Sequence, residues 1–262
     1  MPTDKRQRQK ENRSQRREKE RKRAIRRTAL RRTRRYFTIL VVLLGVYLVA
    51  VYLQDRPDAL PGAYRQIRDR PTACGAQQPG PFEPKQFEQP SDQGIPQGAA
   101  VTARLRTSCG EVVVELGPAG APATVNSFVF LARQGYFDGM VFHRVLDEFL
   151  VETGDPDADG SGGPGYRLPD EYPGERFAFE EGVVVMDNDG PGTTGSRFFI
   201  VAGEGGGTLA RAFNVLGRVV EGLDTVQEIA ALPVTPNPLG QLSLPLEAAY
   251  LESVEIACTP GC

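Results

Sequence analysis

Residues 183–201, VVVMDNDGPGTTGSRFFIV, place two short apolar runs on either side of a glycine-rich turn. Similar apolar runs occur at MVFHRV (140–145), FLVE (149–152) and FNVLGRVV (213–220), each close to glycine or polar turn residues. Runs of this length between turn signals are typical of β-strands. Many short strands with few helices favour a closed antiparallel barrel or a sandwich over an alternating βαβ fold.

The segments around these runs carry compatible signals. VTARLRTSCGEVVVEL (101–116) alternates apolar and polar residues around a Ser-Cys-Gly turn, which predicts a β-hairpin with Val113 and Leu116 among its inward residues. TVNSFVFLARQG (124–135) spaces its apolar residues at helical intervals, and LDTVQEIAAL (223–232) predicts a second, shorter helix. We therefore expect two helices in an otherwise β fold.

The N-terminal part of the chain has a different composition. Residues 1–35 contain 17 Lys and Arg against four Asp and Glu, whereas the remaining 227 residues contain 14 against 29. Tyr36 to Leu53, YFTILVVLLGVYLVAVYL, follow without a charge, and 18 such residues are about the minimum that crosses ~30 Å of hydrocarbon as a helix. The positive-inside rule then leaves the basic tail in the cytoplasm and places everything after residue 54 across the membrane.

We therefore expect a single-pass anchor in the cell membrane. A cleaved signal peptide fits less well, because the charged segment before the apolar run is long and no clear small-x-small site follows that run. The basic tail is expected to contact anionic lipid headgroups rather than nucleic acid. Residues 54–100 hold eight prolines and five glycines, so we expect an extended linker at 54–98 and a folded domain at 99–262.

All four cysteines follow the apolar segment, on the side of the membrane where disulfides persist. They have no paired Cys-x-x-Cys spacing of the kind that indicates zinc, so we expect disulfides and no metal. Four cysteines allow three connectivities. We favour Cys74–Cys109 together with Cys258–Cys262.

Two other features suggest chemistry on their own. His143 is the only histidine, and because no nucleophile pattern accompanies it, a structural hydrogen-bonding role is favoured. Asp155, Asp157 and Asp159 stand at positions 1, 3 and 5 of a calcium-loop pattern, but position 12 is Tyr166 rather than glutamate. An ordinary acidic turn is the favoured interpretation, and loose calcium binding is the alternative.

FHRVLDEFLVETGDPDADGSGGPGY (142–166) and VVVMDNDGPGTTGSRFFIV (183–201) resemble the two signature stretches of the cyclophilins. The similarity extends over roughly residues 99–258 and says nothing about residues 1–98. It implies an eight-stranded antiparallel barrel closed at its ends by two helices, and cis–trans isomerisation of Xaa-Pro bonds in polypeptides. That reaction needs no cofactor, because its barrier of ~18–20 kcal/mol comes from amide resonance and falls when the twisted state is favoured.

The resemblance assigns catalysis to Arg144. A cation that donates a hydrogen bond toward the prolyl nitrogen stabilises the twisted bond, because that nitrogen has an available lone pair only when double-bond character is lost. The resemblance implies an apolar pocket for the proline ring, formed by Phe149, Met186, Phe199 and Leu209. From the hydrophobic pattern alone, these four residues would be placed in the barrel core. Asn188 falls where the backbone of the family pairs with the substrate.

Four pocket positions depart from the pattern of the family, one of them Thr208, which replaces a tryptophan associated with binding cyclosporin. Glu152 and Arg197 stand where the family usually has glutamines, and Phe213 replaces a histidine in the pocket wall. An ionised Glu152 only accepts hydrogen bonds, so it is able to hold Arg144 away from substrate. We expect instead an ion pair between Glu152 and Arg197 that leaves Arg144 available.

The favoured function is a membrane-held isomerase that accelerates the folding of proline-containing segments in exported proteins. One alternative is a chaperone or peptide-binding module with the same fold and poor turnover. Another is a calcium-dependent surface protein that uses the loop at Asp155, Asp157 and Asp159. An isomerisation assay with and without Arg144 separates the first two.

Overall fold

The computed structural model describes residues 43–45, 47, 60–117, 119–259 and 261–262, and the chain divides into two units, Met1–Ala59 and Leu60–Cys262. In the first unit, residues 43–45 and 47 are helical. The predicted basic tail at 1–35 and the rest of the predicted membrane segment at 36–53 lie outside the described residues. Within the described ranges, no helix has the length and apolar character needed to cross a membrane.

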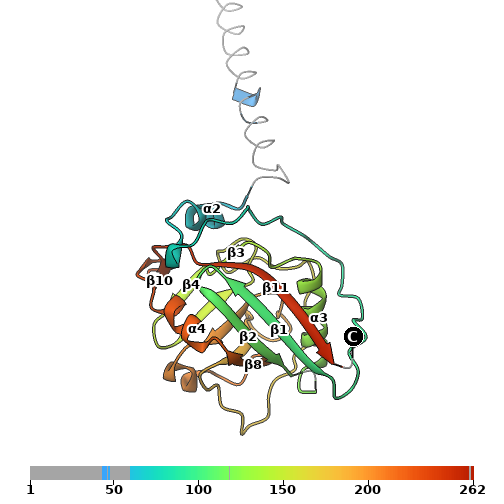
Figure 1. Cartoon of the computed structure of the whole chain (residues 1–262). Helices are drawn as coiled ribbons and strands as arrows, with labels where there is room; N and C mark the ends of the chain where they lie inside the picture. The colour runs from blue at the N-terminus through green and yellow to red at the C-terminus, as the bar shows by residue number, and fades with distance from the viewer. Residues whose placement is uncertain (1–42, 46, 48–59, 118, 260) are drawn as a thin grey trace, which may run out of the picture. The chain divides into compact units, whose positions relative to one another are not determined.

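The second unit is mainly β (Figure 1). Its helices are α2 (Gly62–Arg68), α3 (Pro122–Arg133) and α4 (Leu223–Ala230), with two 3₁₀ turns, η1 (Ala73–Gly75) and η2 (Glu204–Thr208). Its strands are β1 (Ala100–Thr107), β2 (Gly110–Leu116), β3 (Met140–Val141), β4 (Arg144–Leu146), β5 (Leu150–Thr153), β6 (Val183–Met186), β7 (Phe198–Val201), β8 (Val215–Glu221), β9 (Val234–Pro236), β10 (Leu242–Pro245) and β11 (Tyr250–Thr259). The predicted helices correspond to α3 and α4, and α2 is additional.

The predicted hairpin is present as β1 and β2, with Thr107 paired to Gly110 across the turn. Val112, Val114 and Leu116 face the main core, as the two-residue period of a strand requires. Leu116 was predicted correctly, whereas Val113 is covered but lies on the other face of the strand and outside this core cluster.

Nine of the described strands form one antiparallel sheet in the order β3-β11-β1-β2-β8-β6-β7-β5-β4, and β9 with β10 forms a separate pair. The edge strands β3 and β4 are joined by only two residues, which brings the two edges of the curved sheet close together. They do not pair with each other. The expectation of a closed eight-stranded barrel was therefore wrong in strand number and in closure.

The barrel stays open because the chain changes partner between two adjacent residues. The Phe142 N–H donates to the Ala249 carbonyl beside β11, whereas the His143 N–H donates to the Glu152 carbonyl on β5. The chain therefore runs on from β3 into β4 instead of turning back to pair with it. This opening lies next to Arg144, the first residue of β4.

The helices α3 and α4 lie on opposite sides of the strands β11, β1 and β2 (Figure 1). α3 packs against β11 and β8, and α4 packs against β2, β4 and β5. Pro122 begins α3, and the Glu171 carboxylate accepts the N–H groups of Ala123 and Thr124 at 3.0 and 2.8 Å. An acidic group at a helix N-terminus satisfies donors that have no partner within the helix.

Residues 60–98 differ from the extended linker expected at 54–98, because they pack against the barrel. Tyr64 and Ile67 of α2 and Phe82 are fully buried in the main core. The Tyr64 hydroxyl donates to the Gly139 carbonyl at 2.8 Å, and Thr72 forms a parallel bridge with Ala248. Isolated apolar anchors of this kind leave no periodic signal in a sequence.

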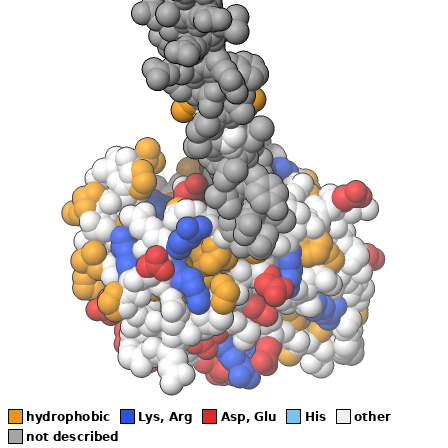
Figure 2. Space-filling model, turned by 90° about the horizontal axis from the view of Figure 1, so that it is seen from above, with side chains coloured by type: hydrophobic (Ala, Val, Ile, Leu, Met, Phe, Trp, Pro, Cys, Tyr) orange, Lys and Arg blue, Asp and Glu red, His pale blue; other side chains and the backbone are white. Residues whose placement is uncertain are grey.

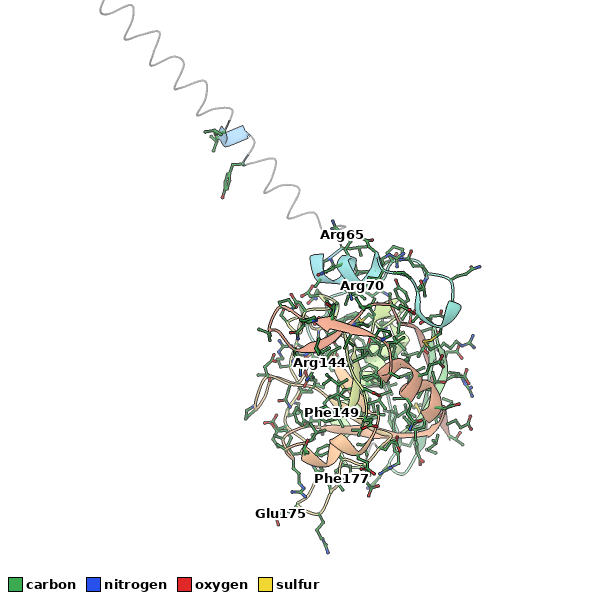
Figure 3. The ribbon with its side chains drawn as sticks, turned by 90° about the vertical axis from the view of Figure 1, so that its left-hand side faces the viewer. Arg65, Arg70, Arg144, Phe149, Glu175 and Phe177 are labelled. Atoms are coloured by element: carbon green, nitrogen blue, oxygen red, sulfur yellow. A yellow bond between two sulfur atoms is a disulfide. The ribbon has the colours of Figure 1, made fainter. Side chains whose placement is uncertain are left out.

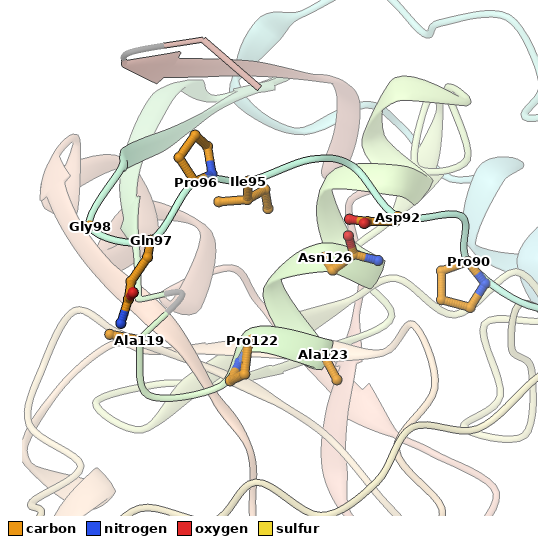
Figure 4. Close-up of a pocket in the computed structure, with 10 residues that line it drawn as sticks. All are labelled: Pro90, Asp92, Ile95, Pro96, Gln97, Gly98, Ala119, Pro122, Ala123 and Asn126. Atoms are coloured by element: carbon orange, nitrogen blue, oxygen red, sulfur yellow. The ribbon is translucent and has the colours of Figure 1, made fainter.

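The favoured disulfide connectivity is confirmed. Cys74 joins Cys109 in the β1–β2 turn, and Cys258 on β11 joins Cys262. The first bond therefore fixes the N-terminal segment to the central hairpin. Further along, the same segment passes α3 and leaves a cavity of about 630 Å³, lined by Pro90, Ile95, Pro96, Pro122 and Asn126 among others (Figure 4).

Candidate active site

A row of paired residues crosses four strands of the sheet and builds the site. Arg144 on β4 pairs with Glu152 on β5, Glu152 with Phe199 on β7, and Phe199 with Val185 on β6. Side chains of directly paired residues point to the same face of a sheet. The catalytic candidate, its acidic neighbour and an aromatic ring are therefore placed side by side by strand register.

An apolar cluster surrounds Phe199 on this outer face. The Phe199 ring packs edge-on against Phe213 with the ring centres 5.7 Å apart. The half-buried side chains of Phe149 and Leu209 pack against the same cluster, whose floor includes Leu150. Figure 3 shows Arg144 and Phe149 on the same side of the molecule. Three of the four predicted pocket residues, together with Phe213, thus form one apolar cluster on the sheet face that also carries Glu152 and Arg144.

Met186 is the exception among the predicted pocket residues. It is fully buried and belongs to the main core. Alternation explains this position, because Val183 and Val185 of the same strand point to the outer cluster and Met186 must point the other way. Leu150, which lies two residues before Glu152 on β5 and shares its face, occupies the outer cluster instead.

Arg144 is held at two points and is 31% exposed. Its Nη1 donates to Glu152 Oε2 at 3.0 Å, and its Nε donates to Gln241 Oε1 at 3.3 Å. A guanidinium has five N–H donors. Within the part of the chain that the structure describes, these two contacts orient the group and leave its remaining donors for a ligand.

Glu152 is the centre of a buried charged network. Its side chain is 4% exposed, and Oε1 lies 3.4 Å from His143 Nε2. Burial alone would raise the pKa of Glu152, but the hydrogen bond and charge of His143, together with Arg144, hold that pKa at about 2. Burial likewise opposes charge on His143, and the interaction with Glu152 outweighs it and raises the pKa of the imidazole. His143 therefore has the hydrogen-bonding position expected of it.

Asp187, at the end of β6, adds a second carboxyl group to this network. Burial raises the pKa of Asp187 to about 7, and the charge of Glu152 and a hydrogen bond with it act in the same direction. Two neighbouring buried carboxyl groups resist ionising together, so one of them retains a proton. Near neutral pH, Glu152 carries the charge and Asp187 is partly protonated.

The expected ion pair between Glu152 and Arg197 is not formed. Arg197 Nη2 lies 3.1 Å from Asp187 Oδ2 and 2.8 Å from Asp189 Oδ1. Glu152 pairs with the catalytic candidate Arg144 instead. The sequence shows which residues carry charge, but not which of them pair. Pairing depends on the direction of each side chain, and Arg197 points toward Asp187 and Asp189.

Comparisons with known proteins agree with this geometry. The family of cyclophilin-type peptidyl-prolyl cis-trans isomerases matches residues 102–246, which is more than half of the chain. The chain belongs to this family. "Peptidyl-prolyl cis-trans isomerase-like 3" from Rattus norvegicus is 34% identical over 163 residues, which cover 61% of this chain and 98% of that protein. A putative peptidyl-prolyl cis-trans isomerase from Staphylococcus saprophyticus is 34% identical over 189 residues, covering 61% and 93%.

The fold is shared with a solved cyclophilin. The crystal structure of a cyclophilin-type isomerase from Cryptosporidium parvum matches with a TM-score of 0.55 at 23% identity, covering 61% of this chain and 98% of that one. This likeness supports the barrel architecture. The relatives and the family match together establish the protein as a cyclophilin-type peptidyl-prolyl cis–trans isomerase.

The other candidate residues of this cyclophilin have local structural contacts. The Asn188 amide donates to the Ala212 carbonyl at 2.8 Å and its oxygen accepts the Gly190 N–H, so the side chain shapes its own loop. The Asp155, Asp157 and Asp159 carboxylates lie within 4.8 Å of one another. However, the buried Asp155 carboxylate accepts hydrogen bonds from the N–H groups of Asp157, Asp159 and Gly160. Its oxygens therefore already hold the loop together.

Three residues of the cyclophilin site were missed from the sequence. Leu150 could have been found from strand alternation relative to Glu152. The only signal for Asp187 is its place as an acidic residue directly after a buried apolar strand. Gln241 lies 97 residues from Arg144, on a hairpin outside the signature stretches, and nothing in its surroundings indicates the contact.

Proposed function

We propose that this isomerase acts on proline-containing segments of exported proteins, on the outer side of a membrane in which residues 36–53 anchor it. The Cys74–Cys109 bond carries the proposal, because it joins the N-terminal segment to the hairpin of the catalytic unit. Disulfides of this kind persist in oxidising compartments. The basic residues 1–35 would then contact anionic lipid on the cytoplasmic side.

In the proposed reaction the proline ring rests against Phe199, and the acyl side of the bond turns beside Arg144. The free donors of the guanidinium face the prolyl nitrogen only when the bond is twisted. Their hydrogen bond is therefore stronger in the transition state than in either planar state, which accelerates the rotation. Glu152 and Gln241 fix the guanidinium, so little reorganisation is needed during the reaction.

The role of Arg144 is tested with the full-length protein and a short Ala-Pro peptide whose cis and trans forms are followed by exchange NMR. Removal of one transition-state donor is expected to lower kcat/KM about 10²-fold or more in Arg144→Ala. The control Arg218→Ala removes an exposed arginine on β8 that pairs with Glu180, and it should leave kcat/KM unchanged. Equal turnover in wild type and Arg144→Ala would reject this role. Tight peptide binding with turnover absent from both proteins would favour the chaperone function.

The membrane location is tested separately. Protease added to right-side-out membrane vesicles should remove residues 60–262 and leave the basic tail protected. Trapping of free thiols during isolation should leave Cys74 and Cys109 unlabelled. A catalytic unit that is protected from the protease, or Cys74 and Cys109 recovered as free thiols, would contradict the proposed location.

A further inference from the structure

The β9–β10 hairpin lies beside the catalytic arginine, and of its tip only Gln241 has a role so far. β10 packs against β4, the edge strand that begins with Arg144 (Figure 1). Gln241, immediately before β10, accepts the hydrogen bond from Arg144 Nε at 3.3 Å. The tip of the hairpin is therefore continuous with the active site.

The tip has a defined conformation. Asn237 Oδ1 accepts the N–H groups of Leu239 and Gln241, each at 3.0 Å, and the Asn237 N–H donates to the Gln241 carbonyl at 2.8 Å. Gly240, with φ of +82°, completes the turn in the left-handed region that favours glycine. At the base of the hairpin, the Leu246 N–H donates to the Pro233 carbonyl at 2.7 Å. The positions of the tip side chains are thus set by hydrogen bonds at both ends.

This ordered hairpin presents leucines to solvent. Leu239 is 93% exposed and Leu242 is 59% exposed, and Leu246 beyond the second strand is also exposed. Among the described residues of the catalytic unit, only one other large hydrophobic, Val220 on β8, is comparably exposed. Figure 2 shows hydrophobic side chains at the edge of the molecule on the side where β10 is labelled in Figure 1. Single exposed apolar residues are ordinary, but a group of them on a fixed turn beside a catalytic residue favours a binding role.

We propose that Leu239 and Leu242 form an apolar edge of the substrate site, which binds an apolar side chain within a few residues of the substrate proline. This inference rests on the proposed action of Arg144. A substrate chain whose proline ring lies against Phe199 passes Arg144. Gln241, which accepts the hydrogen bond from Arg144, lies between Leu239 and Leu242 in the chain, so both leucines are within two residues of that contact. The enzyme would therefore prefer prolines in unfolded, apolar-rich segments over prolines in polar loops.

The test uses the full-length protein and two matched eight-residue peptides with the same Ala-Pro centre. One peptide has leucine on both sides of this centre and the other has serine. Wild type should show kcat/KM about tenfold higher for the leucine peptide, as burial of one apolar side chain predicts. The double variant Leu239→Ser/Leu242→Ser should lose this preference and keep its rate on the serine peptide. Both leucines are exposed, so the substitutions leave the core intact, and circular dichroism verifies the fold.

Two further variants make the outcome specific. Val220→Ser removes the other exposed apolar side chain and should keep the preference. Gln241→Ala frees Arg144 Nε and should slow both peptides to the same extent. The inference is overturned if wild type does not distinguish the peptides, or if the double variant slows both equally. Failure of the proposed function looks different, because Arg144→Ala would then match wild type on both peptides.

Discussion

Glu152 is the residue that pairs with the positive charge of Arg144. A glutamate only accepts hydrogen bonds, and this one accepts from Arg144 while also contacting His143 and Asp187. Its single charge is therefore divided among several neighbours. The ion pair with Glu152 orients the Arg144 guanidinium through one N–H group and leaves other N–H groups exposed.

Glu152→Gln should retain or raise kcat/KM, by up to about threefold, because glutamine still accepts from Arg144 and removes the opposing charge. The same change should lower the pKa of Asp187, since the charge and hydrogen bond of Glu152 help to raise it. Carboxyl NMR titration and the exchange assay measure the two effects. A tenfold loss of turnover with the fold intact would show that the glutamate charge itself assists catalysis.

Asp187 makes stability depend on pH. Its pKa is raised from 3.8 to about 7 in the folded protein, so its contribution is complete below about pH 4 and is lost as the pH rises through 7. Glu152 acts oppositely, and its contribution is lost as the pH falls from 4.5 toward 2. We expect the free energy of unfolding to fall by on the order of 2 kcal/mol between pH 5 and pH 8.

Asp187→Asn should flatten this decline, because asparagine can donate to Glu152 at every pH. Urea unfolding of both proteins at pH 5, 6.5 and 8 provides the measurement. His143 also has a raised pKa and contributes a decline of the same sign, so the informative quantity is the difference between the two proteins. If the free energy of unfolding changes with pH in the same way in both proteins, Asp187 is not the group whose titration causes the decline.

At the element scale, the segment between residues 60 and 98 works as part of the barrel. α2 contributes Tyr64 and Ile67 to the core, and the Cys74–Cys109 bond fixes the following turn to β1 and β2. This bond closes a loop with a sequence separation of 35 residues. Such a cross-link stabilises a folded chain mainly by restricting the unfolded one.

Replacing both Cys74 and Cys109 by serine should lower the free energy of unfolding by about 2–4 kcal/mol. The matched control replaces Cys258 and Cys262, which lie four residues apart at the C-terminal end and restrict the unfolded chain far less. Denaturant unfolding of the two double variants gives the comparison. If both double variants lose the same free energy of unfolding, the Cys74–Cys109 bond does not stabilise the protein through loop closure.

The elements that were predictable have local causes. Alternation identified the β1–β2 hairpin, and helical spacing identified α3 and α4. The signature stretches contain Arg144, Glu152 and Phe199, and strand register brings these three residues into one row with Glu152 in the middle. Contacts between distant segments were not predictable. The Arg144–Gln241 contact, the partners of Arg197 and the packing of α2 depend on which way side chains point after folding, and charge or hydrophobicity alone does not encode this.

At the scale of the whole molecule, the boundary of the folded unit lies at residue 60 and not at residue 99. Contacts divide the chain at Leu60, whereas the match to the cyclophilin family begins at residue 102. A chain built from the family boundary would lose the three large anchors Tyr64, Ile67 and Phe82 and the disulfide to Cys109. It would also expose the core surface that those side chains cover.

Truncation at these two boundaries should therefore give different proteins. A chain beginning at Leu60 should unfold at nearly the same denaturant concentration as the full chain. A chain beginning at residue 99 should lose about 5 kcal/mol or more, because burial of each large apolar anchor stabilises by about 1.5–3 kcal/mol and the disulfide adds about 2–4. Since domains have only about 5–15 kcal/mol in total, the shorter chain should be partly unfolded and bind hydrophobic dyes. Equal stability of the two truncated chains would show that residues 60–98 rest on a barrel that is already complete.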